Sequence, residues 1–259
     1  MQRTYVVTGA ASGIGAATAA WLGERGGRVI GCDLRDAEVT ADLASPQGRA
    51  TLVGGVARAS GGAIDAVIAV AGGGPLDPSC LSLNFFGAVA TLEGLRPLLA
   101  SSPAPRAVAV SSLASAVAAD DALVRACLAL DEPAALAAAE EVIAAGKTPL
   151  LYGSAKQALN RWCRKAAPSP SWAGAGIPLN VVAPGVVDTP GAAPILSDPV
   201  RRQTIAQMLP MPLGGFPGKA EQVAALLAWC ASEENSLMTG QILFIDGGAD
   251  CLTRGERAW

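Results

Sequence analysis

The stretch Thr8-Gly9-Ala10-Ala11-Ser12-Gly13-Ile14-Gly15 lies between a short apolar run at residues 5–7 and a helical pattern at residues 13–25. Glycines in a strand-to-helix turn let the backbone approach a ligand closely, and the first turn of a helix offers free N–H groups. A pyrophosphate is a group that such a turn binds well. The stretch predicts the first strand and helix of a dinucleotide-binding fold, although a glycine-rich turn can also be purely structural.

Outward from this turn, short apolar runs alternate with helical patterns along the chain. Such strands favour a parallel sheet covered on both faces, with its carboxyl ends forming one ligand-binding edge. We expect an α/β Rossmann fold, doubly wound, with a mostly seven-stranded parallel sheet, and one dinucleotide-binding and catalytic domain over residues 1–259. The further strands are predicted at 28–32, 39–43, 64–70, 107–111, 179–183 and 242–245, and the further helices from 45 onward and at 81–99, 152–166 and 220–231.

Two stretches interrupt this rhythm. Residues 120–146 are rich in alanine and predict a helical insertion of one or two helices. Residues 189–218 are rich in Pro, Gly, Met and Leu, which predicts an apolar loop or lid.

The composition excludes several mechanisms. The chain has 259 residues, 19 Lys and Arg, 22 Asp and Glu, and no histidine, so a Ser-His-Asp triad or a His-ligated metal is impossible. The net charge of −3 provides no basic field for nucleic acid. The six cysteines form no C-x-x-C pair, and no signal peptide or membrane-spanning run is evident. We expect a cytoplasmic protein without a metal, and with neither nucleic acid nor membrane as a partner.

An acidic residue follows the second predicted strand. Asp33 stands 18 residues after Gly15, where a carboxylate can accept hydrogen bonds from both hydroxyls of an adenosine ribose. A carboxylate there would repel a 2′-phosphate, which favours NAD(H) over NADP(H). Arg35 lies close by and could pair with such a phosphate, so NADP stays the less favoured alternative.

Only two tyrosines are present, and one of them has a lysine one helical turn away. Tyr152 and Lys156 in Tyr152-Gly153-Ser154-Ala155-Lys156 share a helix face. An ammonium close to a phenol stabilises the phenolate and lowers the pKa of the tyrosine, which would let it act as a base. Tyr5 has no such neighbour. An ordinary helix pair is the structural alternative.

The glycine turn, the Y-x-x-x-K pair and the order of elements resemble the short-chain dehydrogenase/reductase family over essentially the whole chain. Asn84 in Leu83-Asn84-Phe85-Phe86-Gly87 and Ser112 in Val110-Ser111-Ser112 match the helix asparagine and the catalytic serine of that family. Residues 180–189, Asn-Val-Val-Ala-Pro-Gly-Val-Val-Asp-Thr, resemble its nicotinamide-binding segment, and Asp246-Gly247-Gly248 matches the end of its last strand.

The resemblance implies a role for each matching residue. Tyr152 would exchange a proton with the alcohol oxygen, Ser112 would hold that oxygen, and Lys156 would bind the nicotinamide ribose. Asn84 would position a water in a proton relay. The cofactor-binding residues implied by the glycine turn, Asp33 and the resemblance are Gly9, Ser12, Gly13, Ile14, Gly15, Asp33, Leu34, Asp42, Leu43, Ala71, Gly72, Tyr152, Lys156, Pro184, Gly185, Val187 and Thr189.

Two departures from the family pattern stand out. The family's N-N-A-G turn reads Ala69-Val70-Ala71-Gly72, so the asparagine side-chain contacts are missing. The catalytic serine and tyrosine are 40 residues apart, a much longer gap than in most members.

The insertion, the phrase at residues 33–39 and Ser111-Ser112-Leu113-Ala114-Ser115 resemble the bacterial 3α-hydroxysteroid dehydrogenase/carbonyl reductase branch, with aromatic-alcohol dehydrogenases of the coniferyl type also similar. The expected substrate is a small hydrophobic alcohol or ketone held by Ser112, Tyr152, Pro190, Ile195, Leu196 and Met208. The loop could equally cover the core or a subunit contact. The resemblance implies an oligomer, usually a homotetramer, and because the insertion falls near the family's subunit contact, a homodimer is expected equally. A non-catalytic NAD-binding scaffold is the alternative from another class, and a sugar-nucleotide epimerase fits less well.

Overall fold

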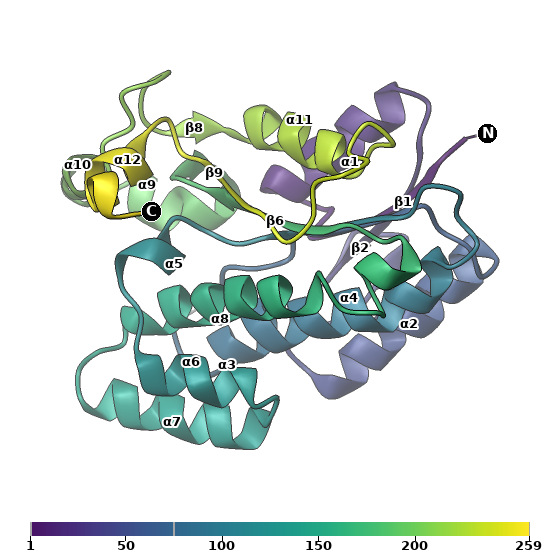
Figure 1. The fold of residues 1–259 in the computed structure, drawn as a ribbon. Helices are drawn as coiled ribbons and strands as arrows, with labels where there is room; N and C mark the ends of the chain where they lie inside the picture. Colours follow the sequence, from purple (N-terminus) through teal and green to yellow (C-terminus); the bar gives the residue numbers. More distant parts are fainter. Residues whose placement is uncertain (1, 75, 259) are drawn as a thin grey trace.

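One parallel sheet forms the centre of the molecule. The computed structural model describes residues 2–74 and 76–258. Within them, seven parallel strands are ordered β3-β2-β1-β4-β5-β6-β9 (Figure 1). The strands are β1 (Thr4–Thr8), β2 (Arg28–Asp33), β3 (Val39–Thr40), β4 (Ala66–Ala69), β5 (Arg106–Val110), β6 (Leu179–Pro184) and β9 (Ile242–Ile245), with β7 (Val187–Asp188) and β8 (Gly218–Lys219) pairing separately.

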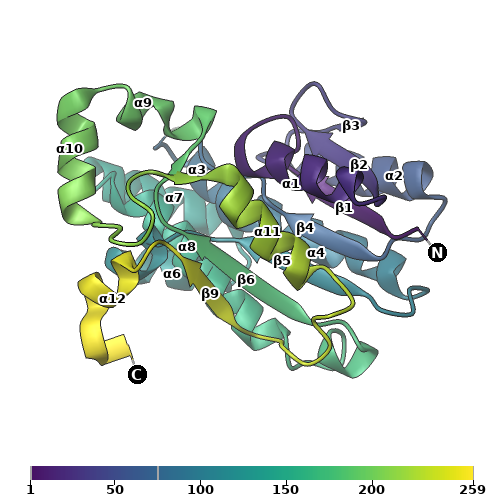
Figure 2. The same cartoon turned by 90° about the horizontal axis from the view of Figure 1, so that it is seen from above.

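Helices cover both faces of this sheet, which confirms the predicted doubly wound Rossmann fold. Helices α1 (Gly13–Glu24) and α11 (Ala220–Cys230) lie side by side on one face, as Figure 2 shows. The other face carries α2 (Pro46–Ser60), α4 (Ala88–Leu95) and α8 (Leu150–Ala166) (Figure 1). Each face therefore has its own buried apolar cluster, one containing Leu22 and Leu227 and the other containing Leu52, Leu92 and Leu159.

The stretch 120–146 contains two helices, α6 (Asp121–Leu128) and α7 (Glu132–Ala144), stacked on the outside of α8 and α3 (Ser79–Leu81) (Figure 1). Each begins at an aspartate, Asp120 or Asp131, whose side chain accepts hydrogen bonds from backbone N–H groups of the first turn. Leu123, Val124 and Ala139 are fully buried, so the two helices extend the core on this face.

The long helix predicted at 81–99 is present as one uninterrupted helical run from 79 to 99, but its type changes along the chain. The run consists of α3, a π-helical turn η1 (Ser82–Gly87), α4 and a 3₁₀ turn η2 (Arg96–Leu99). The side chain of Asn84 donates to the carbonyl oxygen of Cys80, one turn earlier, inside the wide turn. Pro97 lacks a backbone N–H, which favours the short 3₁₀ ending.

The stretch 189–218, predicted as an apolar loop or lid, is partly helical. This stretch contains η4 (Pro190–Ala192), α9 (Ala193–Leu196) and α10 (Pro199–Met208). Pro190, Pro194 and Pro199 stand in the first turns of these three elements, where the missing N–H group costs nothing, so they start helices instead of breaking them. Asp198 then caps α10 by accepting from the N–H groups of Val200 and Arg201. The remaining elements are α5 (Ala114–Val117), η3 (Ala173–Ala175), α12 (Ala249–Arg254) and η5 (Gly255–Ala258).

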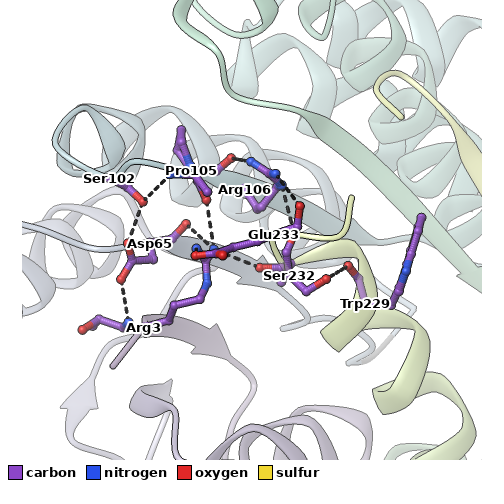
Figure 3. A network of polar contacts seen from close by, with 11 residues as sticks. Arg3, Asp65, Ser102, Pro105, Arg106, Trp229, Ser232 and Glu233 are labelled. Carbon is purple, nitrogen blue, oxygen red and sulfur yellow. Dashed lines mark hydrogen bonds and ion pairs between the residues drawn. The ribbon is translucent and has the colours of Figure 1, made fainter. Parts of the chain in front are cut away.

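Two arginines close the amino edge of the sheet (Figure 3). Arg106, only 6% exposed, donates hydrogen bonds to the carbonyl oxygens of Pro105, Ser232 and Glu233. Arg3 donates to the carbonyl oxygens of Asp65, Ala104 and Ala231 and pairs with the Glu233 carboxylate at 3.2 Å. The Asp65 carboxylate accepts hydrogen bonds from the Thr4 N–H and the Ser102 hydroxyl.

Candidate active site

The glycine turn leads from β1 into α1 at the carboxyl edge of the sheet. Gly9 and Gly13 have φ angles of 70° and 52°, in the left-handed region that favours glycine. A β-carbon at Gly15 would lie 2.0 Å from the carbonyl oxygen of Gly9, so no larger residue fits there. Ser12 begins α1 without capping a backbone N–H, which leaves N–H groups of the first turn for a ligand. Ile14 packs into the core beneath the turn.

The side chain of Thr8 holds the backbone of the neighbouring turn at residues 69–72. The Thr8 hydroxyl accepts hydrogen bonds from the N–H groups of Val70 and Ala71, each at 3.0 Å. A β-carbon at Gly9 would lie 3.1 Å from the Cα atom of Ala71, so the two turns are in contact. The departure from the N-N-A-G pattern therefore leaves this turn fastened to β1.

Asp33 lies at the end of β2, beside the glycine turn. Its carboxylate accepts hydrogen bonds from the Ala11 N–H at 2.9 Å and the Leu34 N–H at 2.6 Å. These bonds fix the carboxylate between β2 and the glycine turn, where an adenosine ribose would lie in a fold of this type. The side chain of Leu34 is 62% exposed next to it.

Asp42 and Leu43 form the next turn. The Asp42 carboxylate accepts from the Ala44 N–H at 2.9 Å, so it stabilises the turn that ends β3 early. Leu43 is buried, and it lies against Gly87, where a β-carbon would be 2.9 Å from the Leu43 carbonyl oxygen.

The lysine and the asparagine converge at the centre of the carboxyl edge. Lys156 on α8 is 1% exposed, and its Nζ atom donates to the Val110 carbonyl oxygen at 2.9 Å. It lies 5.7 Å from the ring centroid of Tyr152. A β-carbon at Gly72 would be 2.9 Å from Lys156 Nζ and 2.8 Å from Asn84 Oδ1. The fold thus brings together α8, the end of β5, the turn at Gly72 and the η1 turn, which are distant in sequence.

The amide of Asn84 is fully engaged with the backbone. Its Oδ1 atom accepts from the Gly73 N–H, and its Nδ2 atom donates to the carbonyl oxygens of Gly73 and Cys80, each at 2.9 Å. Asn84 therefore ties the π-helical turn to the turn after β4.

Burial dominates the electrostatics of the tyrosine and the lysine. Burial raises the pKa of Tyr152 to about 12, against a hydrogen bond from Ser112 that lowers it. Burial lowers the pKa of Lys156 to about 8. The expectation that Lys156 lowers the pKa of Tyr152 is not met in the protein alone, because desolvation outweighs the other influences and the ammonium is directed to the Val110 carbonyl.

The segment after β6 closes the site on the side of α1. A β-carbon at Gly185 would lie 3.0 Å from the Cα atom of Asp246, and one at Gly13 would lie 3.1 Å from Thr189 Cβ. The Thr189 hydroxyl accepts from the Ala192 N–H at 3.3 Å. The glycine turn and the segment predicted to hold the nicotinamide therefore touch, with Pro184 in β6 and Val187 in β7.

The residues predicted to contact substrate occupy the short helices after Thr189. Ile195 and Met208 are 40% and 60% exposed, Leu196 is buried, and Pro190 begins η4. Their role stays a prediction. Met211 packs against Gly185 and Gly247, which places it nearer the end of the sheet.

Sequence reasoning missed the groups that support the site through the main chain. The Val110 carbonyl holds Lys156 and the Cys80 carbonyl holds Asn84, and neither depends on side-chain identity. Thr8 begins the quoted stretch, so a hydroxyl immediately before the first glycine is the signal that could have pointed to its role.

Comparisons with known proteins agree with this geometry. The family profile described as "Enoyl-(Acyl carrier protein) reductase" matches residues 134–250. The chain is 36% identical to a 3-alpha-hydroxysteroid dehydrogenase/carbonyl reductase of Comamonas testosteroni, over 96% of this chain and 97% of that one. It is 33% identical to a cis-4-hydroxycyclohexanecarboxylate dehydrogenase of Sinomonas cyclohexanicum, covering 95% and 96%.

A solved structure is similar over nearly the whole fold. The 3-alpha-hydroxysteroid dehydrogenase from Pseudomonas sp. B-0831, crystallised in complex with NADH, superposes with a TM-score of 0.88. It is 35% identical, and the match covers 98% of this chain and 99% of that one.

The parallel sheet, the glycine turn and the Tyr152–Lys156 pair define an oxidoreductase of the Rossmann class. The chain belongs to the short-chain dehydrogenase/reductase family. This confirms the predicted family and the resemblance to the bacterial hydroxysteroid dehydrogenase/carbonyl reductase branch. In the part of the chain that the structure describes, no helix has the length and apolar character needed to cross a membrane.

Proposed function

We propose that the chain is an NAD(H)-dependent oxidoreductase that interconverts a hydrophobic secondary alcohol, such as a hydroxysteroid or a similarly bulky compound, and its ketone. The convergence of Lys156, Asn84 and Tyr152 at the carboxyl edge of the sheet carries this proposal. The similarity to two dehydrogenases of ring-bearing alcohols and to an NADH-bound structure supports it.

The residues present fit a dinucleotide. The glycine turn packs closely against its neighbours without side chains at Gly9, Gly13 and Gly15, and the first turn of α1 offers N–H groups for a pyrophosphate. Asp33 beside this turn favours NAD(H), because its carboxylate would repel the 2′-phosphate on the ribose of NADP(H). When bound, the nicotinamide supplies or accepts the hydride.

Each residue of the chain would then act at a stated atom. In ketone reduction, the Tyr152 hydroxyl donates its proton to the carbonyl oxygen, which the Ser112 hydroxyl also holds. Lys156 keeps two N–H donors beyond the bond to Val110 and would offer them to a ribose. The Asn84 side chain already holds Gly73 and Cys80, so any water it positions would be held by its backbone.

We further propose that residues 1–259 form a single dinucleotide-binding and catalytic domain. The proposed location is the cytoplasm, and the proposed assembly is a homodimer or homotetramer. The described residues contain six free cysteines, five of them buried, in keeping with a reducing compartment. An aromatic alcohol of the coniferyl type is the alternative substrate.

A substrate panel tests the reaction. Absorbance of NADH would be followed with hydroxysteroids and oxosteroids, substituted cyclohexanols and cyclohexanones, coniferyl-type primary alcohols, and short aliphatic alcohols. We expect the bulky secondary alcohols and ketones to give the highest kcat/KM. Preference for the coniferyl-type alcohol would select the alternative, and no turnover with any compound despite NADH binding would select the non-catalytic scaffold.

The cofactor assignment is tested at Asp33. Asp33→Ala should lower the ratio of kcat/KM for NAD over that for NADP by about tenfold, because the repulsion of a 2′-phosphate disappears. Asp36→Ala, in the same turn, is the matched control. An unchanged ratio in Asp33→Ala would contradict the assignment.

A further inference from the structure

The side chain of Arg49 connects three segments of the chain. Arg49 lies in the first turns of α2, and its side chain is 11% exposed. Its Nε atom donates to the Leu43 carbonyl oxygen at 2.9 Å, and its Nη2 atom donates to the Ser82 carbonyl oxygen at 2.9 Å. The same guanidinium forms a two-pronged pair with the Glu132 carboxylate, at 2.6 Å and 2.7 Å. The rigid fork of arginine suits this arrangement, and a lysine could not reproduce it.

Glu132 is the first residue of α7, in the helical insertion, and its side chain is 17% exposed. Burial alone would raise the pKa of Glu132, but hydrogen bonds from Arg49 and from the Ser82 hydroxyl, together with the Arg49 charge, lower it. The carboxylate is therefore ionised at neutral pH. Arg49, Glu132 and Ser82 form a triangle of neighbouring residues, in which the Arg49 guanidinium donates to both the Glu132 carboxylate and the Ser82 carbonyl oxygen.

Two of the segments joined by this triangle belong to the proposed site. Ser82 begins the π-helical turn that contains Asn84, whose amide holds Gly73, the residue after Gly72, and Gly72 lies beside Lys156. Leu43 belongs to the turn with Asp42, and both residues are among those that the family resemblance implies for cofactor binding. Gly87, at the far end of the π-helical turn, also contacts the Leu43 turn, since a β-carbon there would lie 2.9 Å from the Leu43 carbonyl oxygen.

We propose that Arg49 and Glu132 are a positioning pair, by which the helical insertion holds the Asn84 turn and the Leu43 turn in register for the cofactor. The proposal rests on the proposed function. A two-pronged pair of low exposure has one geometry, so removing Glu132 leaves the buried Arg49 charge without its partner and loosens the orientation of the guanidinium that binds both turns. The insertion is then part of the machinery that orients the site, although neither residue touches the reacting atoms.

The test replaces Glu132 and measures cofactor binding separately from turnover. Glu132→Ala should weaken NADH binding, followed by fluorescence titration, and raise the KM for NAD(H) by roughly three- to tenfold, with a smaller fall in kcat. Glu132→Gln, which keeps the shape and one acceptor oxygen, should fall between wild type and Glu132→Ala. NADH binding needs no substrate, so this readout stands even if the substrate panel shows no turnover.

Two controls separate positioning from general stability. Val142→Ala removes buried atoms from the same helix α7 without touching the triangle. Asp121→Asn removes an exposed, 3.8 Å pair with Arg161 at the start of α6. We expect both controls to bind NADH as wild type does at a temperature well below unfolding. Equal weakening in Val142→Ala and Glu132→Ala at equal loss of Tm, or wild-type binding in Glu132→Ala, would overturn the proposal.

Discussion

The two ends of the central sheet each bury a cation, and they use it in opposite ways. At the amino edge, Arg106 donates hydrogen bonds to three carbonyl oxygens. Arg3 beside it donates to three further carbonyl oxygens and pairs with the Glu233 carboxylate. At the carboxyl edge, the structure records one bond for the Lys156 ammonium, to Val110. An ammonium has three donors, so two stay available.

This difference distinguishes Arg106, which stabilises the fold, from Lys156, which is proposed to bind the cofactor. A guanidinium satisfied by main-chain oxygens stabilises the edge where strands begin and gains nothing from a ligand. A buried ammonium with unused donors is costly in the protein alone, as its lowered pKa shows, and becomes satisfied when hydroxyl groups approach. The same residue class thus serves stability at one end and proposed function at the other.

The two tyrosines give the largest expected contrast between the ends. Tyr152→Phe should reduce turnover by about 10³-fold while NADH still binds, because it removes the proton that the reaction needs. Tyr5 lies at the other end, under Arg3, with 5.6 Å between the guanidinium carbon and the ring centroid. Tyr5→Phe, the matched control, should keep wild-type turnover in the NADH absorbance assay. An active Tyr152→Phe variant would remove the basis of the proposed mechanism.

The two buried cations come next. Lys156→Met should lower kcat/KM by about 100-fold and weaken NADH binding. Arg106→Met should instead leave the kinetics at 25 °C unchanged and lower the stability by roughly 3 kcal/mol, or Tm by about 6–12 °C, because three carbonyl oxygens lose their donor. Kinetics and thermal unfolding would be measured on both variants. A lower kcat/KM in Arg106→Met with a wild-type Tm would contradict the contrast between the two cations.

The pH dependence of stability gives the smallest expected effect. Burial lowers the pKa of Lys156 from 10.5 to about 8, so between these values the unfolded chain binds a proton that the native protein has lost. The free energy of unfolding contributed by Lys156 therefore increases as the pH rises through this window. Urea unfolding curves should show wild type gaining stability relative to Lys156→Met from about pH 8 to about pH 10.5. A constant difference would mean that the ammonium is not desolvated in the native state.

The sequence predicts the sheet well because parallel strands buried on both faces are continuous apolar runs. The last strand, at 242–245, is predicted with its observed ends. The predicted 39–43 strand ends at Thr40, since the Asp42 side chain competes for the backbone by forming a turn. The helix predicted at 81–99 is present, but the pattern does not reveal its π-helical turn, in which the Asn84 side chain binds the backbone of Gly73 and Cys80. The helices within 189–218 are missed because prolines in a first turn start a helix instead of breaking it.

The candidate site shows the same division. Tyr152, Lys156, Ser112 and Asn84 are found by spacing and by order in the chain, because their side chains identify them. The pKa of Tyr152 could not be predicted, since it depends on burial that only the packed fold creates. The Arg49–Glu132 pair joins residues 83 positions apart, and no local pattern marks it.

The turns around the site are held largely by the main chain, and this affects how the sequence can diverge. Thr8 binds the N–H groups of Val70 and Ala71, so the turn after β4 survives without the two asparagines of the family pattern. Every residue except proline presents the same N–H group, whatever its side chain. The residues at positions 69 and 70 can therefore be replaced by ones that pack well in the core. Their identities are poor markers of activity when genomes are searched for related enzymes.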